Sequence, residues 1–363
     1  MNHNLPMLPL DLELESKTVL KKLVGAHKAL AELKCVAKTI PNDSILITTL
    51  SLQEAKDSSE IENVITTHDE LFQNNSEGDF TSIAAKEVHS YANALRHAVH
   101  LVKENGLLTI NHILKVQQQI EENNAGFRQV PGTSLKNEQT GEVIYTPPQH
   151  PDDIQALMSN LEQFINEDEL SDLDPLIKMA IIHHQFESIH PFYDGNGRTG
   201  RIINMLYLVK MDLLSIPILY LSRFINQNKS DYYRLLQSVR ETNEWEEWIL
   251  FLLEGVEQIS RDGIILIHSI KDQMQFYKNI LRKDLPKIYS QDLLNNIFRH
   301  PYTKIEFVMN DLGIGRVTAA KYLDELVEIN LLNKVKLGRE NYYINPPLYR
   351  LLGSVGDKKA ETT

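Results

Sequence analysis

Apolar residues recur three or four positions apart along most of the chain, which is the spacing of one face of an α-helix. Between residues 19 and 33, for example, leucine and valine occupy mostly helical positions. The same spacing predicts helices over residues 82–103, 109–120, 152–165, 174–188, 198–211, 231–254 and 259–281. Residues 48–71 indicate two short helices on either side of residues 58–63. The chain is therefore expected to be mainly α-helical.

One stretch between the helices has a different pattern. Residues 123–126, Asn-Asn-Ala-Gly, interrupt the helical spacing, and residues 143–146 combine β-branched and aromatic residues as strands do. Residues 137–141 offer turn chemistry, and two prolines follow at 147 and 148. We expect a small β-hairpin here, closed by the two prolines.

The C-terminal part of the chain changes in composition after a charged, proline-containing stretch at residues 283–287. Helical spacing then predicts three helices, and alternation predicts a final hairpin, an arrangement typical of a winged helix-turn-helix. The predicted elements cover residues 288–298, 304–312, 317–329 and 335–344. The expected domains are an N-terminal helical region (1–81), a core (82–282), a winged module (283–350) and a polar, disordered tail (351–363).

Composition narrows the class of protein. The 363 residues carry 37 Lys and Arg against 49 Asp and Glu, a net charge of −12. This net negative charge does not attract the chain as a whole to nucleic acid or to an anionic membrane. Cys35 is the single cysteine, which excludes an intramolecular disulfide and a cysteine-built metal site. The sequence contains neither a signal-peptide pattern nor a run of ~18 apolar residues. We expect a cytoplasmic protein without membrane association.

The segment HPFYDGNGRTGR at residues 190–201 concentrates groups suited to a polyphosphate and its metal. His190 can act as a base, and Asp194 offers a carboxylate. The Gly-Asn-Gly turn at 195–197 can expose backbone N–H groups, and the helix expected after it directs its positive end to the same place. Two arginines, three residues apart, share one face of that helix. Each feature alone is common in structural turns, so it is their convergence within one short loop that favours a phosphate site.

Two histidines before the loop raise the alternative of a zinc site that includes His190. His183 and His184 are adjacent on an expected helix and must point in different directions, which disfavours a three-histidine site. We expect His184 to lie in the core and His183 to be partly exposed.

The loop resembles the Fic motif, His-Pro-Phe-x-Asp/Glu-Gly-Asn-Gly-Arg-x-x-Arg, and matches it at every fixed position. The resemblance extends over roughly residues 82–254, including Gly-Phe-Arg at 126–128 and Tyr-Thr-Pro-Pro at 145–148. It implies a Fic-type helical bundle with a hairpin flap. It also implies transfer of AMP from ATP to Ser, Thr or Tyr hydroxyls of proteins, the chain itself included, with release of pyrophosphate. Some relatives that transfer phosphate instead carry lysine at the position of Gly197, and the glycine here favours AMP transfer.

The resemblance implies a role for each residue of the loop. His190 would be the general base, with the ordinary histidine pKa of about 6.5, and Asp194 would hold Mg²⁺ against the α- and β-phosphates. The N–H groups of residues 195–197 and the Asn196 side chain would form an anion hole, the two arginines would hold the β- and γ-phosphates, and Tyr233 would contact adenine. The residues implied in nucleotide binding are Gly195, Asn196, Gly197, Arg198, Thr199, Gly200, Arg201, Asn228 and Tyr233, with Arg240 nearby. The hairpin at residues 130–145 would clamp an extended target segment.

Ser58, Glu62 and Asn63 resemble the inhibitory motif of the family, Ser/Thr-x-x-x-Glu-Gly/Asn. Of six Glu-Gly or Glu-Asn pairs in the chain, only the one at Glu62 has Ser or Thr four residues earlier. It lies on an expected helix N-terminal to the core, where one class of Fic proteins carries the motif. We expect Glu62 to pair bidentately with Arg201 and so to compete with the γ-phosphate of ATP. A capped helix with a solvated glutamate is the alternative.

The expected winged module carries nine Lys and Arg against seven Asp and Glu over residues 285–350. Arg316, Thr318 and Lys321 lie near the start of its third helix, but three acidic residues follow on the same helix. This balance disfavours DNA as a partner, and protein contacts or a homodimer are the alternatives. Two other functions stay open: a transcription regulator whose Fic core only senses nucleotide, and an enzyme that removes AMP from proteins with Glu62 positioning a water.

Overall fold

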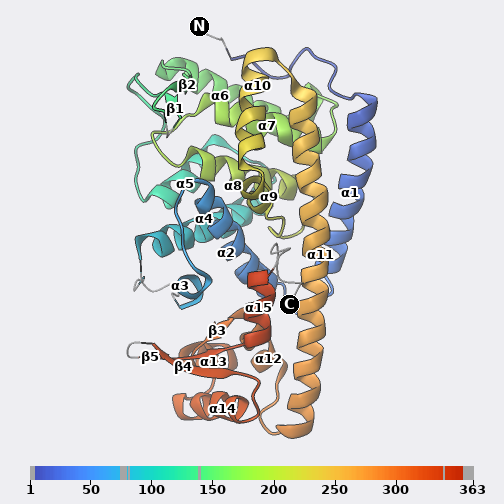
Figure 1. The fold of residues 1–363 in the computed structure, drawn as a ribbon, viewed down its shortest axis with the longest axis vertical. Coiled ribbons are helices and arrows are strands. Elements are labelled where there is room, and N and C mark those ends of the chain that lie inside the picture. Colours follow the sequence, from blue (N-terminus) through green and yellow to red (C-terminus); the bar gives the residue numbers. More distant parts are fainter. Residues whose placement is uncertain (1–4, 74–79, 81, 138–139, 338–339, 355–363) are drawn as a thin grey trace.

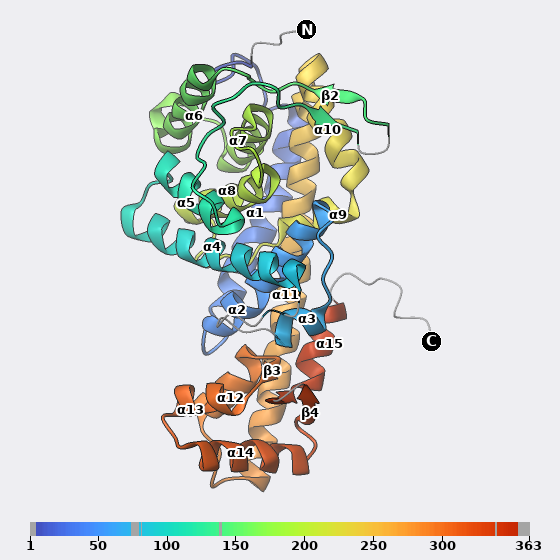
Figure 2. The same ribbon diagram turned by 90° about the vertical axis from the view of Figure 1, so that its left-hand side faces the viewer.

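The structure is a computed structural model that describes residues 5–73, 80, 82–137, 140–337 and 340–354. Helices dominate it, as the apolar spacing predicts (Figure 1). A bundle of helices packs against the first half of one very long helix, α11, and a smaller C-terminal part packs against its second half (Figures 1 and 2). None of the helices in the described ranges is both long and apolar enough to cross a membrane.

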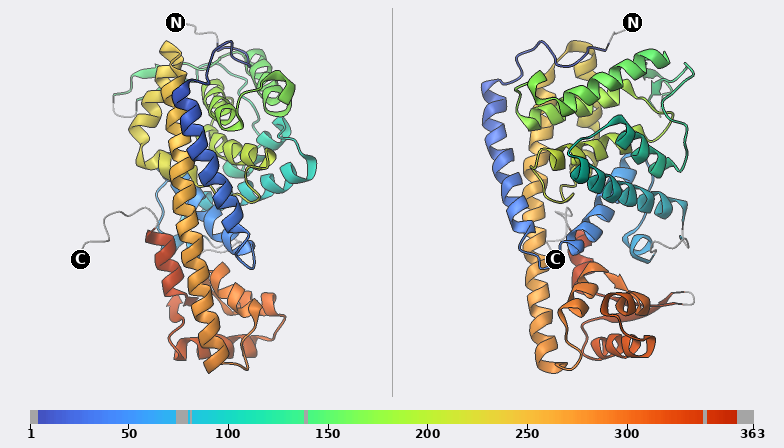
Figure 3. Two further views of the ribbon diagram at one scale, coloured as in Figure 1. Left: turned by 90° about the vertical axis from the view of Figure 1, so that its right-hand side faces the viewer. Right: turned by 180° about the vertical axis from the view of Figure 1, so that it is seen from behind.

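Helix α11 (Trp245–Asp284) has 40 residues, which corresponds to about 60 Å at 1.5 Å per residue. Helix α1 (Lys17–Ala37) lies along its first half, where Lys22 pairs with Glu257 at 2.8 Å (Figure 3). The second half of α11 passes the expected domain boundary after residue 282 without a break and ends at Asp284, within the charged stretch at residues 283–287. The bundle and the C-terminal part therefore share one continuous helix.

The expected division into helices over residues 231–254 and 259–281 is wrong. The break comes earlier, because Asn243 adopts a left-handed backbone (φ 61°) after α10 (Lys229–Thr242). Gly255, which lies inside α11 and does not interrupt it, permits close packing. A Cβ at this position would lie 2.7 Å from the ring of Phe224 on α9 (Leu221–Gln227), a helix that the apolar spacing did not predict.

Helices α7 (Pro175–Ile189) and α8 (Asn196–Lys210) form the centre of the bundle and pack against each other. Every residue of α7 after its first proline is buried, which explains why its apolar pattern has no polar face. The helices around this pair include α2 (Ser44–Ile61), α4 (Ile83–Asn105), α5 (Ile110–Glu121) and α6 (Pro151–Asn166), and a single 3₁₀ turn, η1 (Asp168–Leu170), precedes α7. The short connection between α7 and α8 faces α2, α4 and α5 (Figure 2).

The N-terminal helices differ from expectation at residues 58–63. Residues 58–61 are part of α2, which continues to Ile61, and only Glu62 and Asn63, whose backbone is left-handed (φ 63°), lie beyond its end. The short helix α3 (His68–Gln73) follows. The expected hairpin is confirmed as an antiparallel pair, β1 (Leu135–Lys136) and β2 (Val143–Tyr145), in which Leu135 faces Tyr145.

The C-terminal module, which we define as residues 285–354, contains the three expected helices and the hairpin. They are α12 (Gln291–Arg299), α13 (Ile305–Leu312), α14 (Arg316–Glu328), β4 (Asn333–Leu337) and β5 (Glu340–Ile344). A further strand, β3 (Tyr302–Thr303), completes an antiparallel sheet in the order β3-β5-β4.

The chain then forms one more helix, α15 (Pro346–Ser354), which packs on α11. The expectation of disorder from residue 351 is therefore wrong for residues 351–354, because Leu348 and Leu352 are buried in the core. The rest of the expected tail, residues 355–363, lies outside the described residues.

Candidate active site

The loop between α7 and α8 presents its polar groups at one cavity of about 410 Å³. Helix α7 ends at His190, which adopts a left-handed backbone (φ 48°), and Gly195 (φ 78°) turns the chain into α8. Positive φ at a histidine is strained, and such strain is common at functional loops. The cavity is lined by Glu62, Val64, Glu87, Glu121, His190, Tyr193, Asp194, Gly195, Asn196, Gly197 and Arg198.

His190 is half-buried at the start of the loop, directly after α7. Burial, reinforced by the charges of Arg128 and Arg240, lowers the pKa of its imidazole to about 4, and Glu62 offsets this only in part. The expectation of an ordinary histidine pKa is therefore wrong. At neutral pH the ring carries no charge, which is the state required of a base.

Arg128, from the Gly-Phe-Arg stretch, fixes this part of the loop. Its buried guanidinium donates hydrogen bonds to the carbonyls of His190 (2.8 Å) and Pro148 (2.8 Å), so it ties the loop to the segment after the hairpin. The hydroxyl of Tyr193 accepts from the backbone N–H groups of Gln129 (2.9 Å) and Val130 (3.2 Å). The sequence marked Arg128 as part of the resemblance but gave no sign of this bracing role.

Asp194 is exposed at the cavity, and its Oδ1 accepts the N–H of Gly195 at 2.7 Å. A lone exposed carboxylate beside a helix N-terminus suits Mg²⁺, which keeps several waters and takes phosphate oxygens as ligands. Within the described residues, no cluster of three or more His, Cys, Asp or Glu side chains could hold a metal by itself.

The Asn196 side chain is placed differently from the expected anion hole. Its Oδ1 accepts the N–H of Phe192 (2.9 Å) and its Nδ2 donates to the Phe192 carbonyl (2.8 Å), so the amide holds the loop together. Thr199 is fully buried. Gly200 lies under α7, where a Cβ would come within 2.5 Å of the Glu187 carboxylate, so its lack of a side chain serves packing.

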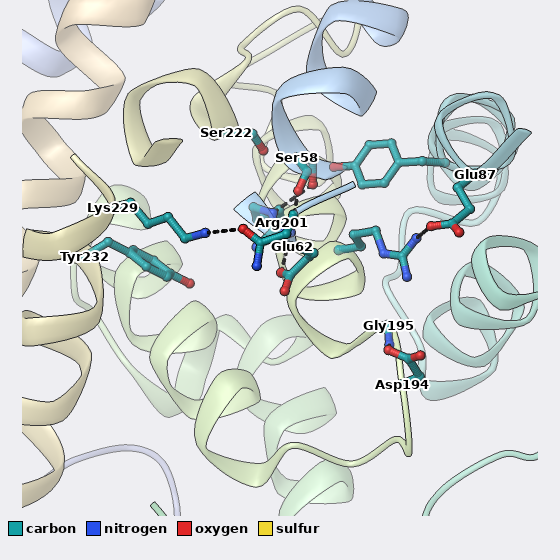
Figure 4. Close-up of polar contacts among 12 residues, drawn as sticks. Ser58, Glu62, Glu87, Asp194, Gly195, Arg201, Ser222, Lys229 and Tyr232 are labelled. Atoms are coloured by element: carbon teal, nitrogen blue, oxygen red, sulfur yellow. Dashed lines mark hydrogen bonds and ion pairs between the residues drawn. The ribbon is translucent and has the colours of Figure 1, made fainter. Parts of the chain in front are cut away.

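Arg201 and Glu62 are in direct contact, as expected (Figure 4). Nη2 of Arg201 donates to Glu62 Oε1 at 2.8 Å and to the carbonyl of Ser58 at 3.0 Å, and Nε donates to Ser58 Oγ at 2.8 Å. The expected bidentate pair is wrong, because a single carboxylate oxygen of Glu62 is bonded, while Ser58 accepts from Nε and Nη2 of Arg201. Burial raises the pKa of Glu62, but the charge and hydrogen bond of Arg201 outweigh it and hold the pKa below the ordinary value.

The Glu62 carboxylate also covers the N-terminal end of α8. A Cβ built on Gly197 would lie 2.2 Å from Glu62 Oε1, so the carboxylate occupies the space directly above this glycine. Asn63, beside it, accepts a hydrogen bond from Nζ of Lys229 at 3.4 Å. The carboxylate therefore stands where the backbone N–H groups and the positive end of α8 favour an anion.

Arg198 is held by two carboxylates that the sequence did not single out. Its Nη1 donates to Glu87 on α4 at 3.0 Å and its Nη2 to Glu121 on α5 at 2.7 Å. Burial raises the pKa of Glu121, the charge of Arg198 opposes this, and Asp194 reinforces it. With Glu62 and Asp194, four carboxylates line the cavity against the single guanidinium of Arg198, so the lining carries more negative than positive charge.

Asn228 and Tyr233 are not among the described residues that line the cavity. Asn228 Nδ2 donates to the carbonyl of Phe224 (2.8 Å) where α9 meets α10, and the side chain of Tyr233 is 46% exposed on α10. Arg240 donates from Nε to Ser188 Oγ at 3.0 Å, near the end of α7.

The expectation of a partly exposed His183 is wrong. Its ring is fully buried, stacks on Trp248 and forms a hydrogen bond of 2.9 Å with the hydroxyl of Tyr232. Burial, together with the charge of Arg201, lowers the pKa of His183 to about 3. His184 lies in the core, as expected.

Family models match most of the chain. The model described as Fic/DOC family N-terminal matches residues 20–100, and the Fic/DOC family model matches residues 107–208, which contain the loop. A third model, described as the C-terminal domain of SoFic-like protein adenylyltransferases, matches residues 273–348. The chain belongs to the Fic/DOC family.

Similar proteins agree with this assignment. A protein adenylyltransferase Fic of Drosophila erecta is 28% identical over 151 residues, 42% of this chain and 28% of that protein. One from Drosophila grimshawi is 32% identical over 111 residues, 31% of this chain and 22% of that protein. The chain thus spans about a quarter of the length of these relatives.

Solved structures share the fold. A crystal structure of a Fic family protein from Desulfovibrio desulfuricans G20 has a TM-score of 0.59 at 18% identity, covering 91% of this chain and 96% of that chain. Residues 134–508 of Fic-1 from C. elegans give a TM-score of 0.52 at 17% identity, covering 69% of this chain and 73% of that chain.

Proposed function

We propose that the chain is a protein adenylyltransferase that transfers AMP from ATP to a hydroxyl of a protein side chain, and that Glu62 holds it in a state of low activity. The position of the Glu62 carboxylate carries this proposal. It lies against Gly197 at the start of α8 and bonds Arg201, where the helix end and the guanidinium favour an anion. The names of the relatives, protein adenylyltransferase Fic, support the same reaction.

The proposed reaction needs one proton transfer and one displacement. His190, which is unprotonated at neutral pH, takes the proton of the target hydroxyl. The hydroxyl oxygen bonds to the α-phosphorus, the bond from this phosphorus to the bridging oxygen breaks, and pyrophosphate leaves. Arg198, Arg201 and the N–H groups at the start of α8 balance the charge of the phosphates once Glu62 has moved away.

Mg²⁺ would bind through Asp194 and supply positive charge against the phosphates. The chemistry of the cavity fits this cation, because four carboxylates and only one guanidinium, that of Arg198, line it before ATP adds further negative charge. Asp194 is exposed at the cavity and lies beside the start of α8.

The proposed target is a protein segment in extended conformation, and the chain itself is one candidate. The side chains of Val143 and Ile144 on β2 are 51% and 46% exposed, which suits a strand that receives another. We further propose that residues 1–81, 82–282 and 283–350 are the functional units, with α11 shared by the last two. The order of helices and strands in the C-terminal module supports a winged helix-turn-helix.

The position of the label on ATP tests the reaction. Full-length protein with Glu62→Gly, incubated with Mg²⁺ and ATP labelled at the α-phosphate, is expected to acquire label, and ATP labelled at the γ-phosphate is expected to leave none. His190→Ala in the same background should abolish the α-label. Transfer of the γ-label would show phosphate transfer. If neither label were transferred, a Fic core that only senses nucleotide would explain the protein better than an enzyme.

A further inference from the structure

The C-terminal module holds the inhibitory segment, which we define as residues 53–72, at both of its ends. At the α2 end, the buried side chain of Gln53 donates from Nε2 to the carbonyl of Leu352 on α15 at 2.8 Å. At the α3 end, Oδ1 of Asp69 accepts hydrogen bonds from the hydroxyls of Tyr302 on β3 (2.5 Å) and Tyr349 on α15 (2.9 Å). Glu62 lies between these two attachments.

Aromatic packing strengthens the attachment at α3. The ring of Phe72 stacks on Tyr302 with the centroids 6.1 Å apart, and Tyr349 meets the same ring edge-on at 6.4 Å. Tyr349 also meets the ring of His68 at 6.4 Å. Figure 1 shows α3 above β3 and beside α15, and Figure 3 shows α15 reaching from the module towards α2. The module therefore contacts α3 through the same two tyrosines that bond Asp69.

The α2 attachment is connected to the candidate active site by polar contacts along one helix. Arg223 of α9 donates to Gln53 Oε1 at 3.4 Å and to Asp57 at 3.1 Å. The next residue, Ser58, accepts the hydrogen bond from Arg201. Because α2 is one continuous helix from Ser44 to Ile61, a shift at Gln53 is transmitted to Ser58 and to the end of the helix where Glu62 lies.

The two attachments limit how Glu62 can leave Arg201. Glu62 follows the last residue of α2, and residues 62–67 connect it to α3. For the carboxylate to vacate the space above Gly197, the end of α2 or this connection has to move. The end of α2 belongs to a helix that the C-terminal module contacts, and the connection at residues 62–67 leads into α3, which the module also contacts. The module therefore opposes movement of either segment.

We propose that the C-terminal module is a clamp that sets how firmly Glu62 blocks the nucleotide site, so that loosening the module from residues 53–72 activates AMP transfer. The clamp rests on the proposed function, in which Glu62 is the inhibitory group. It requires two states of the inhibitory segment, and the module stabilises the blocked one. A ligand that binds the module only when it is released from α2 and α3 would act as an activator.

Removing the tyrosine hydroxyls tests the clamp with little change in volume. The double variant Tyr302→Phe, Tyr349→Phe loses both hydrogen bonds to Asp69 but keeps both rings. Tyr343→Phe is the matched control, because its hydroxyl bonds Asp324 at 3.0 Å inside the module. With full-length protein and α-labelled ATP, we expect the initial rate of labelling to rise about three- to tenfold for the double variant, because the blocked state loses two hydrogen bonds. The control should stay within about twofold of wild type.

Combining the variants with Glu62→Gly locates the effect. In that background the double variant should give no further increase, because the blocking group is already absent. A similar increase in both backgrounds would mean that the module acts on another part of the site, and it would overturn the clamp. Asp69→Asn, at an exposed position, provides a second variant. It changes the group that accepts both hydrogen bonds, whereas the double variant removes the two donors.

Hydrogen exchange provides a readout that does not depend on catalysis. Backbone amides of residues 53–64 are expected to exchange faster in the double variant and at the wild-type rate in Tyr343→Phe. If Glu62→Gly is active while the double variant keeps wild-type labelling and exchange, the clamp is wrong and the proposed function stands. If Glu62→Gly is inactive, the proposed function fails, and the exchange rates still decide whether the module restrains the segment.

Discussion

Replacing Glu62 by glycine should increase AMP transfer by about five- to thirtyfold. The substitution removes one charge-assisted hydrogen bond of 2.8 Å to Arg201, whose side chain is 3% exposed. Such bonds contribute about 1.5–3 kcal/mol, but the Glu62 side chain is 36% exposed, so solvent screening reduces this to about 1–2 kcal/mol. At about 1.4 kcal/mol per tenfold, the lost competition corresponds to the stated range.

The assay is the initial rate of α-labelled AMP incorporation at an ATP concentration below saturation. Glu62→Gln keeps the size of the side chain and removes its charge, so its rate should fall between those of wild type and Glu62→Gly. Glu60→Gln is the matched control, because Glu60 lies on the same helix and pairs with Lys56 at 3.1 Å, away from Arg201. If both Glu62 variants label at the rate of the control, Glu62 is not the inhibitory group, and the reasoning from its contact with Arg201 is refuted.

Three further predictions concern the loop. In the Glu62→Gly background, Gly197→Ala should lower labelling at least about tenfold. The added methyl group would lie 2.2 Å from the position that Glu62 Oε1 has in the wild-type chain, which is where we expect a phosphate oxygen to bind. Undiminished labelling would mean that phosphate does not bind above Gly197. Since the pKa of His190 is lowered to about 4 and the neutral ring is the active form, kcat/KM with excess Mg²⁺ should stay level as the pH falls from 7 to 5.5; a halving near pH 6.5 would indicate an ordinary histidine. Arg128→Lys should reduce the free energy of unfolding, measured with denaturant, by about 2 kcal/mol, because lysine cannot reach both the His190 and Pro148 carbonyls; an unchanged midpoint would contradict the bracing role.

The parts of the site that could be predicted from sequence are those whose chemistry lies within one short stretch. The loop at residues 190–201 contains its own base, carboxylate and helix start, so the spacing alone brings them together at one cavity. The contact of Glu62 with Arg201 spans 139 positions and was found only because the inhibitory motif resembles that of relatives. Its geometry, one oxygen instead of two, depends on where α2 ends, and Asn63 determines that through its left-handed backbone.

Contacts made only by tertiary packing left no pattern to find. Glu87 and Glu121, which hold Arg198, come from α4 and α5 at separations of 111 and 77 residues, and each lies in an ordinary helical sequence. The low pKa of His190 follows from burial and from two distant arginines, so its residue type alone suggested an ordinary value. In the same way, the single helix α11 reflects packing around Gly255 that apolar spacing does not reveal.

The apolar spacing succeeded where a helix presents one face to a core, as in α4 and α5. It was less informative for elements that are short or buried on all sides. Helix α9 has seven residues and strand β3 has two, which is too few for the helical or the strand spacing of apolar residues to be recognised. Helix α15 begins with two prolines and follows directly on the hairpin, and its burial against α11 decides its structure.

The most direct test of the proposed function is the mass of the product formed on the protein itself. After incubation of the Glu62→Gly variant with ATP and Mg²⁺, peptide mass spectrometry should find one or more Ser, Thr or Tyr residues heavier by an AMP group. The same residues should be unmodified when His190→Ala is added to this variant. Peptides that carry phosphate instead, or AMP groups that persist without His190, would contradict AMP transfer by this loop.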